Sequence, residues 1–233
     1  MAIRDIYRGQ VALLVRLLPL IAEQTCFALK GGTAINLFIR DMPRLSVDID
    51  LTYLPVQPRA ASLAAIDAAM IAIVGRIQET IGGVLIQEGR TDGAIATLNV
   101  RAQGVQVKIE VTPVLRGCVF DPQVRSVSES VEQTFGFAEI AVVSEADLYG
   151  GKIVAALDRQ HPRDLFDVRE LMANVNAGEI LQRLAGVKVQ HGCKPECPRY
   201  RGHSGFSHFI PEGRRPAPGL TGLGVTGAWN ERA

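Results

Sequence analysis

The sequence lacks a marked excess of either charge: its 233 residues include 25 Lys and Arg against 24 Asp and Glu. A large excess of one sign is what draws a whole protein surface to nucleic acid or to a charged membrane. The near balance gives no broad electrostatic argument for either partner. Any contact with nucleic acid has to come from a local group of residues.

Cysteine is also scarce, and the N-terminal part has no apolar run of membrane-spanning length. Cys26 and Cys118 lie in apolar or loop contexts, and the other two cysteines lie close together near the C-terminus, so we expect reduced thiols. The most apolar N-terminal segment, Val11 to Ala22, is interrupted by Arg16 and Pro19 and is too short for a bilayer. We expect an amphipathic helix there, no membrane partner and a cytoplasmic protein.

The chain is long enough to bury a sizeable core, and its length suits one domain with an appendage. Residues 1–185 mix helical and strand periodicities, which predicts one α+β domain whose part from about residue 144 is helical. Residues 186–233 contain nine Gly and five Pro and show no apolar period. We expect this segment to be an irregular, poorly ordered tail.

Periodicity and turn residues predict the order of elements. We expect a helix at 4–24, a short strand closed by glycine at 26–32, a second helix at 33–40 and a strand at 45–54. A long Ala-rich helix at 60–80 and three successive strands within 82–111 follow. The last predicted elements are a strand leading into a helix at 140–157 and a final helix at 163–174. Ser144 and Asp147 predict a capped helix start, and Pro162 suits the first turn of the last helix.

Two aspartates interrupt the strand predicted at residues 45–54. Side chains alternate across a strand, so Asp48 and Asp50 project to the same face, with Cα atoms roughly 6.5 Å apart. One divalent cation can bridge two such carboxylates. Magnesium prefers carboxylate oxygens and keeps positions open for water and phosphates, which predicts a metal-binding strand.

Gly31 and Gly32 precede the second predicted helix. Unpaired N–H groups at a helix start can receive a phosphate, and a side chain there would block its approach. Thr33 could add a hydroxyl donor. Paired glycines before a helix are more often plain backbone geometry, so the argument depends on the aspartates that follow.

A third carboxylate, Glu110, lies on the polar face of the last of the three successive strands. A phosphate cradle, a strand with two carboxylates and a third carboxylate on a later strand are the parts that a metal-assisted phosphoryl-type transfer needs. The alternative for Glu110 is an ordinary solvent-facing strand residue.

Four segments in order, "LKGGTAINLF", "PRLSVDIDL", "DLYGGKIVAAL" and "RDLFDV", resemble the AbiEii/AbiGii-type toxins, a branch of the nucleotidyltransferase superfamily. The resemblance covers about residues 20–175. It implies a nucleotidyltransferase-like mixed β-sheet flanked by helices and an enzyme that transfers a nucleotide from an NTP to an RNA acceptor, tRNA among the family's acceptors. It also implies the toxin half of a type IV toxin-antitoxin or abortive-infection pair with a cognate antitoxin.

The resemblance assigns roles by position. Asp48 and Asp50 correspond to the carboxylates that hold the catalytic Mg²⁺ against the triphosphate, and Ser46 is similar to the polar position before them. Glu110 stands where the superfamily usually has an aspartate. Lys152 corresponds to a lysine that meets nucleotide phosphates, for which a compact ammonium is suited.

Asp164 matches the late acidic residue of the family, which would be a base for the acceptor hydroxyl or a group that orients Lys152. The rival interpretation is an aspartate favoured by the dipole at a helix start. Asp167, on nearly the same helix face, could pair with Arg163 or Arg169.

Arg44, just ahead of the aspartate strand, could bind a phosphate by bidentate hydrogen bonding. A surface salt bridge between Arg44 and Asp41 is equally consistent with the sequence.

Residues 187–233 resemble no part of the family and look like an out-of-frame or substituted C-terminus. They contain the zinc-ligand types His191, Cys193, Cys197, His203 and His208, although Cys197 and His203 are closer together than in a classical finger.

Two other functions stay open. One is an inactive toxin remnant that only binds NTP or antitoxin, and the other is a glycosyltransferase that uses its D-x-D motif.

Overall fold

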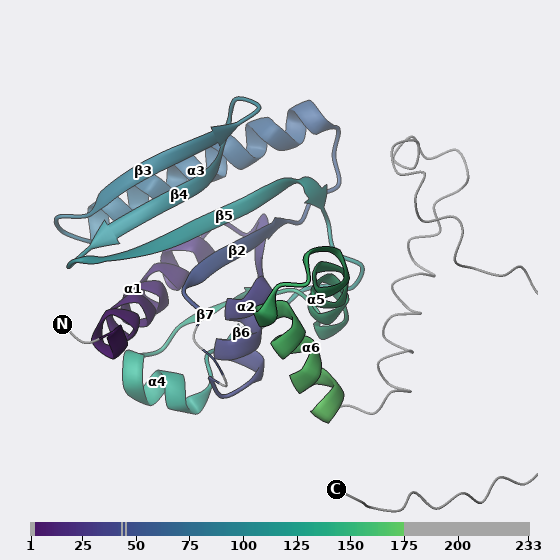
Figure 1. Cartoon of the computed structure of the whole chain (residues 1–233). Helices are drawn as coiled ribbons and strands as arrows, with labels where there is room; N and C mark the ends of the chain where they lie inside the picture. Colours follow the sequence, from purple (N-terminus) through teal and green to yellow (C-terminus); the bar gives the residue numbers. More distant parts are fainter. Residues whose placement is uncertain (1–2, 43, 45, 175–233) are drawn as a thin grey trace, which may run out of the picture. The chain divides into compact units, whose positions relative to one another are not determined.

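The computed structural model describes residues 3–42, 44 and 46–174, and its centre is one seven-stranded sheet (Figure 1). The strand order is β3-β4-β5-β2-β1-β7-β6. The β2–β5 and β1–β7 pairs are parallel and the other pairs are antiparallel. The predicted α+β class with a mixed sheet is therefore confirmed.

The elements have the following bounds. The strands are β1 Phe27–Lys30, β2 Asp48–Tyr53, β3 Leu85–Thr91, β4 Ala94–Ala102, β5 Val105–Arg116, β6 Gln123–Ser126 and β7 Glu139–Val142. The helices are α1 Ile3–Ala22, α2 Gly31–Ala34 continued by a π-helical turn at Ile35–Ile39, α3 Arg59–Thr80, α4 Glu129–Phe135, α5 Glu145–Arg159 and α6 Pro162–Asn174.

The core lies between the sheet and two long helices. α1 packs on β5 and β7, α3 packs on β4, and the two helices contact each other, so both cover the same face. Strand alternation supplies the sheet side of this core, because Ile49 and Leu51 of β2 and Val107 and Ile109 of β5 are fully buried. Asp48 and Asp50, which alternate with those β2 residues, are thereby fixed on a rigid, central strand.

Most predicted elements are found, with some differences in bounds and type. The helix predicted at 33–40 is a short α-helix followed by a π-helical turn, in which the N–H of Arg40 donates to Ile35 O at 2.8 Å. β2 begins at Asp48, since Ser46 and Val47 are not in strand conformation. β6 and α4 lie in a part of the sequence for which no element was predicted.

The end of β5 is irregular. Leu51 of β2 pairs with Val111, but Tyr53 pairs with Arg116, so β5 contains extra residues opposite this point of β2. Pro113 lies in this stretch, and a proline has no N–H to donate to a neighbouring strand. The irregularity extends β5 beyond the predicted strand end.

The N-terminus of α5 is capped as predicted: Ser144 Oγ accepts a hydrogen bond from the Asp147 N–H at 3.0 Å. The carboxylate of Asp147 also accepts from the backbone N–H groups of Val119 and Phe120, at 2.8 and 3.1 Å. This helix start therefore holds the loop that follows β5.

Among the described residues, one helix is long and apolar enough to cross a membrane by length and composition, namely α3. Six of its residues are buried on the sheet side, namely Ser62, Ile66, Ala69, Met70, Ile73 and Ile77. The predicted boundary at residue 185 and the proposed zinc ligands of the tail lie outside the described residues.

Candidate active site

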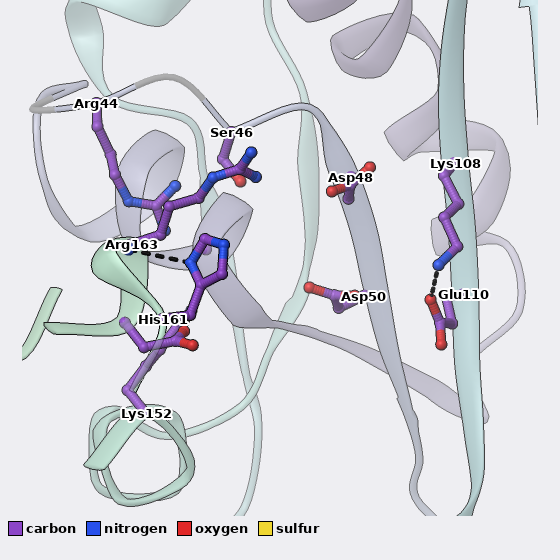
Figure 2. A pocket seen from close by; sticks show the side chains of 11 residues that line it. Arg44, Ser46, Asp48, Asp50, Lys108, Glu110, Lys152, His161 and Arg163 are labelled. Carbon is purple, nitrogen blue, oxygen red and sulfur yellow. Dashed lines mark hydrogen bonds and ion pairs between the residues drawn. The ribbon is translucent and has the colours of Figure 1, made fainter. Parts of the chain in front are cut away.

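The two aspartates of β2 line one pocket of about 260 Å³. The predicted alternation is confirmed: Asp48 and Asp50 are half-buried, and Ile49 and Leu51 between and beside them are buried. Figure 2 shows the two carboxylates one above the other along the strand, with Lys152 on one side and Glu110 of β5 on the other. Both carboxylates can therefore face one bound group.

The paired glycines make room for side chains of this site. Gly31 has φ of +78°, and a Cβ there would collide with the carboxylate of Asp50. A Cβ on Gly32 would lie 2.6 Å from Arg44 Nη2 and 2.9 Å from Ser46 Oγ. Gly32 also lines the pocket, together with Arg44 and Ser46. A phosphate at this helix start stays a prediction, whereas the close approach of protein side chains is observed.

Thr33 has protein partners instead of an exposed hydroxyl. Its side chain is fully buried. The hydroxyl donates to the carbonyl oxygen of Asp48 and lies 3.0 Å from Ser46 Oγ. Thr33 therefore holds the start of β2 in this structure, and its contact with a phosphate stays a prediction.

Lys30 is a site residue that the sequence interpretation missed. It is the last residue of β1 and pairs with Asp50 across the antiparallel strands, and its Nζ donates to Thr112 Oγ1 at 3.3 Å. Burial lowers the pKa of Lys30, and Asp50 and Glu110 act in the opposite direction. Burial also raises the pKa of Asp50, and Lys30 opposes that rise. The sequence signal that could have identified Lys30 is its place at the end of the apolar run "FALK".

Lys152 of α5 is held by two carboxylates of α6. Its Nζ lies 2.9 Å from Asp164 Oδ1 and 3.1 Å from Asp167 Oδ2. The Asp164 and Asp167 side chains are only 1% and 2% exposed, and that of Lys152 is 11% exposed. This geometry matches the interpretation in which Asp164 orients Lys152. A buried carboxylate that already binds an ammonium is poorly placed to accept a proton from an acceptor.

Arg44 pairs with Asp167, and two predicted pairings are wrong. Arg44 Nε and Nη2 donate to the two oxygens of Asp167 at 2.7 and 2.6 Å, a bidentate pair. Asp41, which the sequence left open as an alternative partner of Arg44, instead accepts from the hydroxyls of Ser128 and Ser130. The predicted pairing of Asp167 with Arg163 or Arg169 fails because α6 turns Asp167 toward α5 and β2.

Glu110 lies beside Asp50 in the parallel β2–β5 register. Its carboxylate forms an ion pair with Lys108, two residues earlier on the same strand face (Figure 2). In the described part of the chain, no three His, Cys, Asp or Glu side chains are grouped closely enough to hold a metal ion together. A ligand role for Glu110 therefore stays a prediction, and Asp48 and Asp50 are the stronger pair.

Three further cationic or titratable residues line the pocket and were not predicted, namely Lys108, His161 and Arg163. His161 and Arg163 come from the turn between α5 and α6, where His161 Nδ1 accepts from the Arg163 N–H at 3.2 Å. Strand alternation places Lys108 on the same face of β5 as Glu110. Sequence periodicity gave no signal for His161 and Arg163, because their position depends on how α6 folds back on α5.

The lining of the pocket is formally neutral. Four cationic side chains face four acidic ones, namely Arg44, Lys108, Lys152 and Arg163 against Asp48, Asp50, Glu110 and Asp164. A polyphosphate bound there would need additional positive charge. Two adjacent carboxylates with open space beside them fit a divalent ion that shares its remaining positions with water and phosphate. The donor set therefore fits a hard divalent cation.

The family described as "Nucleotidyl transferase AbiEii toxin, Type IV TA system" matches residues 12–215. The chain belongs to this AbiEii family. The match extends beyond residue 175, where the motif resemblance ended. We expected residues 187–233 to resemble no part of the family, and this expectation is wrong for residues 187–215. Membership of a nucleotidyltransferase family leaves the glycosyltransferase alternative without support.

Two solved structures are similar to the AbiEii-family chain. MenT4, a nucleotidyltransferase toxin from Mycobacterium tuberculosis H37Rv, matches with a TM-score of 0.58 and 19% identity over 78% of this chain. The chain spans 64% of the length of MenT4. ANT(2")-Ia, solved in complex with adenylyl-2"-tobramycin, matches with a TM-score of 0.45 and 15% identity, covering 78% of this chain and 98% of that one. No curated protein sequence matches.

Proposed function

We propose that this AbiEii-family chain is a cytoplasmic, magnesium-dependent nucleotidyltransferase toxin that transfers a nucleotide from an NTP to an RNA acceptor and is neutralised by a cognate antitoxin. The observation that supports this most is the placement of Asp48 and Asp50 in one pocket with Lys152. Family membership supplies the reaction class. The RNA acceptor and the antitoxin are inferred from that membership alone.

In this proposal Asp48 and Asp50 hold the ion. A divalent cation bound there neutralises triphosphate charge and favours departure of pyrophosphate. Lys152, oriented by Asp164 and Asp167, binds phosphate oxygens at the side of the pocket opposite Glu110. Lys30 offsets the charge of the half-buried Asp50. Catalysis would then consist mostly of positioning and of electrostatic stabilisation of the transition state.

Arg163 and Lys108 line the pocket on elements other than the aspartate strand. Guanidinium and ammonium groups bind phosphate oxygens without reading sequence. We assign these two residues to contacts with the phosphates of the acceptor. No broad basic surface is required, because the charges are local.

The direct test is incubation of the purified full chain with each α-labelled NTP and total bacterial RNA, with and without Mg²⁺. Labelled RNA is expected only with Mg²⁺. Asp48→Asn and Asp50→Asn should each lower incorporation by at least about a hundredfold, because a bound metal supplies several kcal/mol of stabilisation. Asp158→Asn, which changes an exposed carboxylate of α5, is the matched control.

Incorporation that survives in Asp48→Asn would refute the proposal. Mg²⁺-dependent binding of an NTP with no transfer to any RNA would favour the other function that the sequence left open, a toxin remnant that only binds.

A further inference from the structure

A row of polar side chains runs across the sheet from the aspartate pocket to the edge strand β3. Strand register places Lys108 of β5 opposite Asp48, Asn99 of β4 opposite Lys108, and Gln87 of β3 opposite Asn99. Opposed residues of neighbouring strands point to the same face of a sheet. Lys108, Asn99 and Gln87 therefore form one polar row, and it begins in the pocket that Asp48 and Lys108 both line.

The polar row lies on the side of the sheet that faces away from the core. α3 packs on β4 and α1 packs on β5, and α3 lies behind β3 and β4 in Figure 1. The strand neighbours of Asn99 and Lys108 point toward these helices and are buried, namely Leu98, Val100, Val107 and Ile109. Asn99 and Lys108 themselves are half-buried, and Gln87 is exposed. The row is therefore accessible from the same side as the aspartates.

Two further side chains orient and extend the polar row. Arg101 pairs with Gln106 across β4 and β5, and its Nε donates to Gln106 Oε1 at 2.5 Å. Gln106 Nε2 in turn donates to Asn99 Oδ1 at 3.2 Å. Because Gln106 occupies the carbonyl oxygen of Asn99, Asn99 presents its amide N–H groups to a ligand. Leu85, opposite Arg101 on β3, is 71% exposed and adds an apolar contact beside the guanidinium.

The charge on this side favours an anionic ligand away from the aspartates. β3 and β4 contribute one cation and no carboxylate to it. The positions concerned are Leu85, Gln87, Gly89, Thr97, Asn99 and Arg101. On β5, Lys108 pairs with Glu110, and their side chains are 42% and 41% exposed. An exposed ion pair contributes little to stability, so a phosphate can displace Glu110 from Lys108.

We propose that a single-stranded stretch of the RNA acceptor lies along the polar row, with Arg101 and Leu85 contacting its bases or phosphates beside the row. The inference rests on the proposed function, because it takes RNA as the acceptor in the aspartate pocket. Unpaired RNA presents its base edges to amide groups and its base faces to guanidinium planes and other side chains. In a duplex those edges are paired, which leaves the amides of Asn99 and Gln87 with backbone contacts alone. The sheet therefore selects an unpaired segment.

The experiment measures binding of the full chain, without NTP, to a short fluorescent single-stranded RNA of mixed sequence and to the same RNA annealed to its complement. The single strand should bind tighter. Arg101→Glu should weaken its binding about tenfold or more, as for loss of a hydrogen bond to a charged group. Gln87→Ala with Asn99→Ala should weaken it about fivefold or more, as for loss of neutral hydrogen bonds. Arg16→Glu, at an exposed arginine of α1, is the control on the core side.

Salt dependence separates phosphate contacts from base contacts. Arg101→Gln should make the slope of log K against log salt concentration shallower by about 0.7, as for loss of one phosphate contact on a single strand. Leu85→Ser should weaken binding without changing that slope, because it removes an apolar contact only. Thermal melting checks that each variant folds. Mg²⁺-dependent NTP binding is measured in parallel and should match the native chain, since none of the substituted side chains lines the aspartate pocket.

The outcomes separate this inference from the proposed function. If the duplex binds as tightly as the single strand, or if Arg101→Glu has no more effect than Arg16→Glu, the sheet site is overturned while NTP binding and transfer stand. Displacement of the RNA by polyglutamate of equal charge at equal concentration also overturns it, since an acidic protein segment would then fit as well. A native chain that binds no NTP overturns the proposed function and this inference with it.

Discussion

Arg44 and Asp167, 123 residues apart in the sequence, form a bidentate ion pair that joins the segment before β2 to α6. Asp167 also contacts Lys152 of α5 at 3.1 Å. One buried carboxylate therefore links the aspartate strand with both helices that carry the candidate phosphate-binding residues. The relative placement of Asp48, Asp50 and Lys152 depends on this link.

Asp167→Asn should destabilise the chain strongly. Removing one partner of a buried ion pair leaves the other charge uncompensated, and such changes lower the free energy of unfolding by about 3 kcal/mol or more. Urea denaturation followed by circular dichroism measures the loss. Glu23→Gln, which breaks a well-formed but exposed pair with Arg76, should have a much smaller effect. Equal losses in the two variants would contradict a structural role for the buried pair.

Lys152 and Asp164 should act as one unit. Lys152→Met is expected to lower the rate of nucleotide transfer on the order of a hundredfold, as for loss of one transition-state contact. Asp164→Asn should lower it less, since Lys152 keeps its contact with Asp167.

The double variant distinguishes the two roles of Asp164. If Asp164 works by orienting Lys152, Lys152→Met with Asp164→Asn should be no slower than Lys152→Met alone. A base role predicts a further, multiplicative loss in kcat. Rates with labelled NTP, measured as kcat and KM for each variant, decide between them.

Gly31→Ala should impair activity more than its effect on stability explains. Its positive φ makes any side chain strained, at about 1–2 kcal/mol, and the new Cβ would displace the Asp50 carboxylate. Gly93→Ala provides a matched control, because Gly93 has φ of +84° and nothing near its added Cβ. Thermal melting should show similar losses for both variants, and the transfer assay should show a loss for Gly31→Ala alone. Equal activities would mean that Asp50 tolerates the displacement.

Cys118 should alkylate slowly at neutral pH. Burial raises the pKa of its thiol, and Asp147 and Asp121 add to that rise. The reactive thiolate is therefore scarcer than for an ordinary thiol at pH 7.5 and becomes abundant only as pH rises through the raised pKa. Iodoacetamide labelling resolved by mass spectrometry measures the rate at each pH.

Asp121→Asn removes one of the charges that raise the Cys118 pKa, so it should accelerate the Cys118 reaction and leave that of Cys26 unchanged. Fast labelling of native Cys118 at pH 7.5 would show that the thiol is not protected. Cys26 and Cys118 are both free cysteines in the structure.

Local pattern predicted the parts of the site that lie on single elements. The alternation of apolar residues around Asp48 and Asp50 was enough to place them on one strand face, and Ser144 marked the start of α5. Lys30 was missed because it takes its place beside Asp50 only through strand pairing. For Arg44 the sequence left a pair with the nearby Asp41 open as one alternative, and the fold brings Asp167 to it instead.

The sequence by itself determined most of the elements, the pair of strand carboxylates and the family motifs, because periodicity and short-range sterics act within a few residues along the chain. Tertiary structure decided which charges meet. The Lys152–Asp164–Asp167–Arg44 network and the pairing of Lys30 with Asp50 across two strands arise where β1, β2, α5 and α6 come together. Such contacts depend on strand register and helix packing between distant segments, which no local pattern encodes.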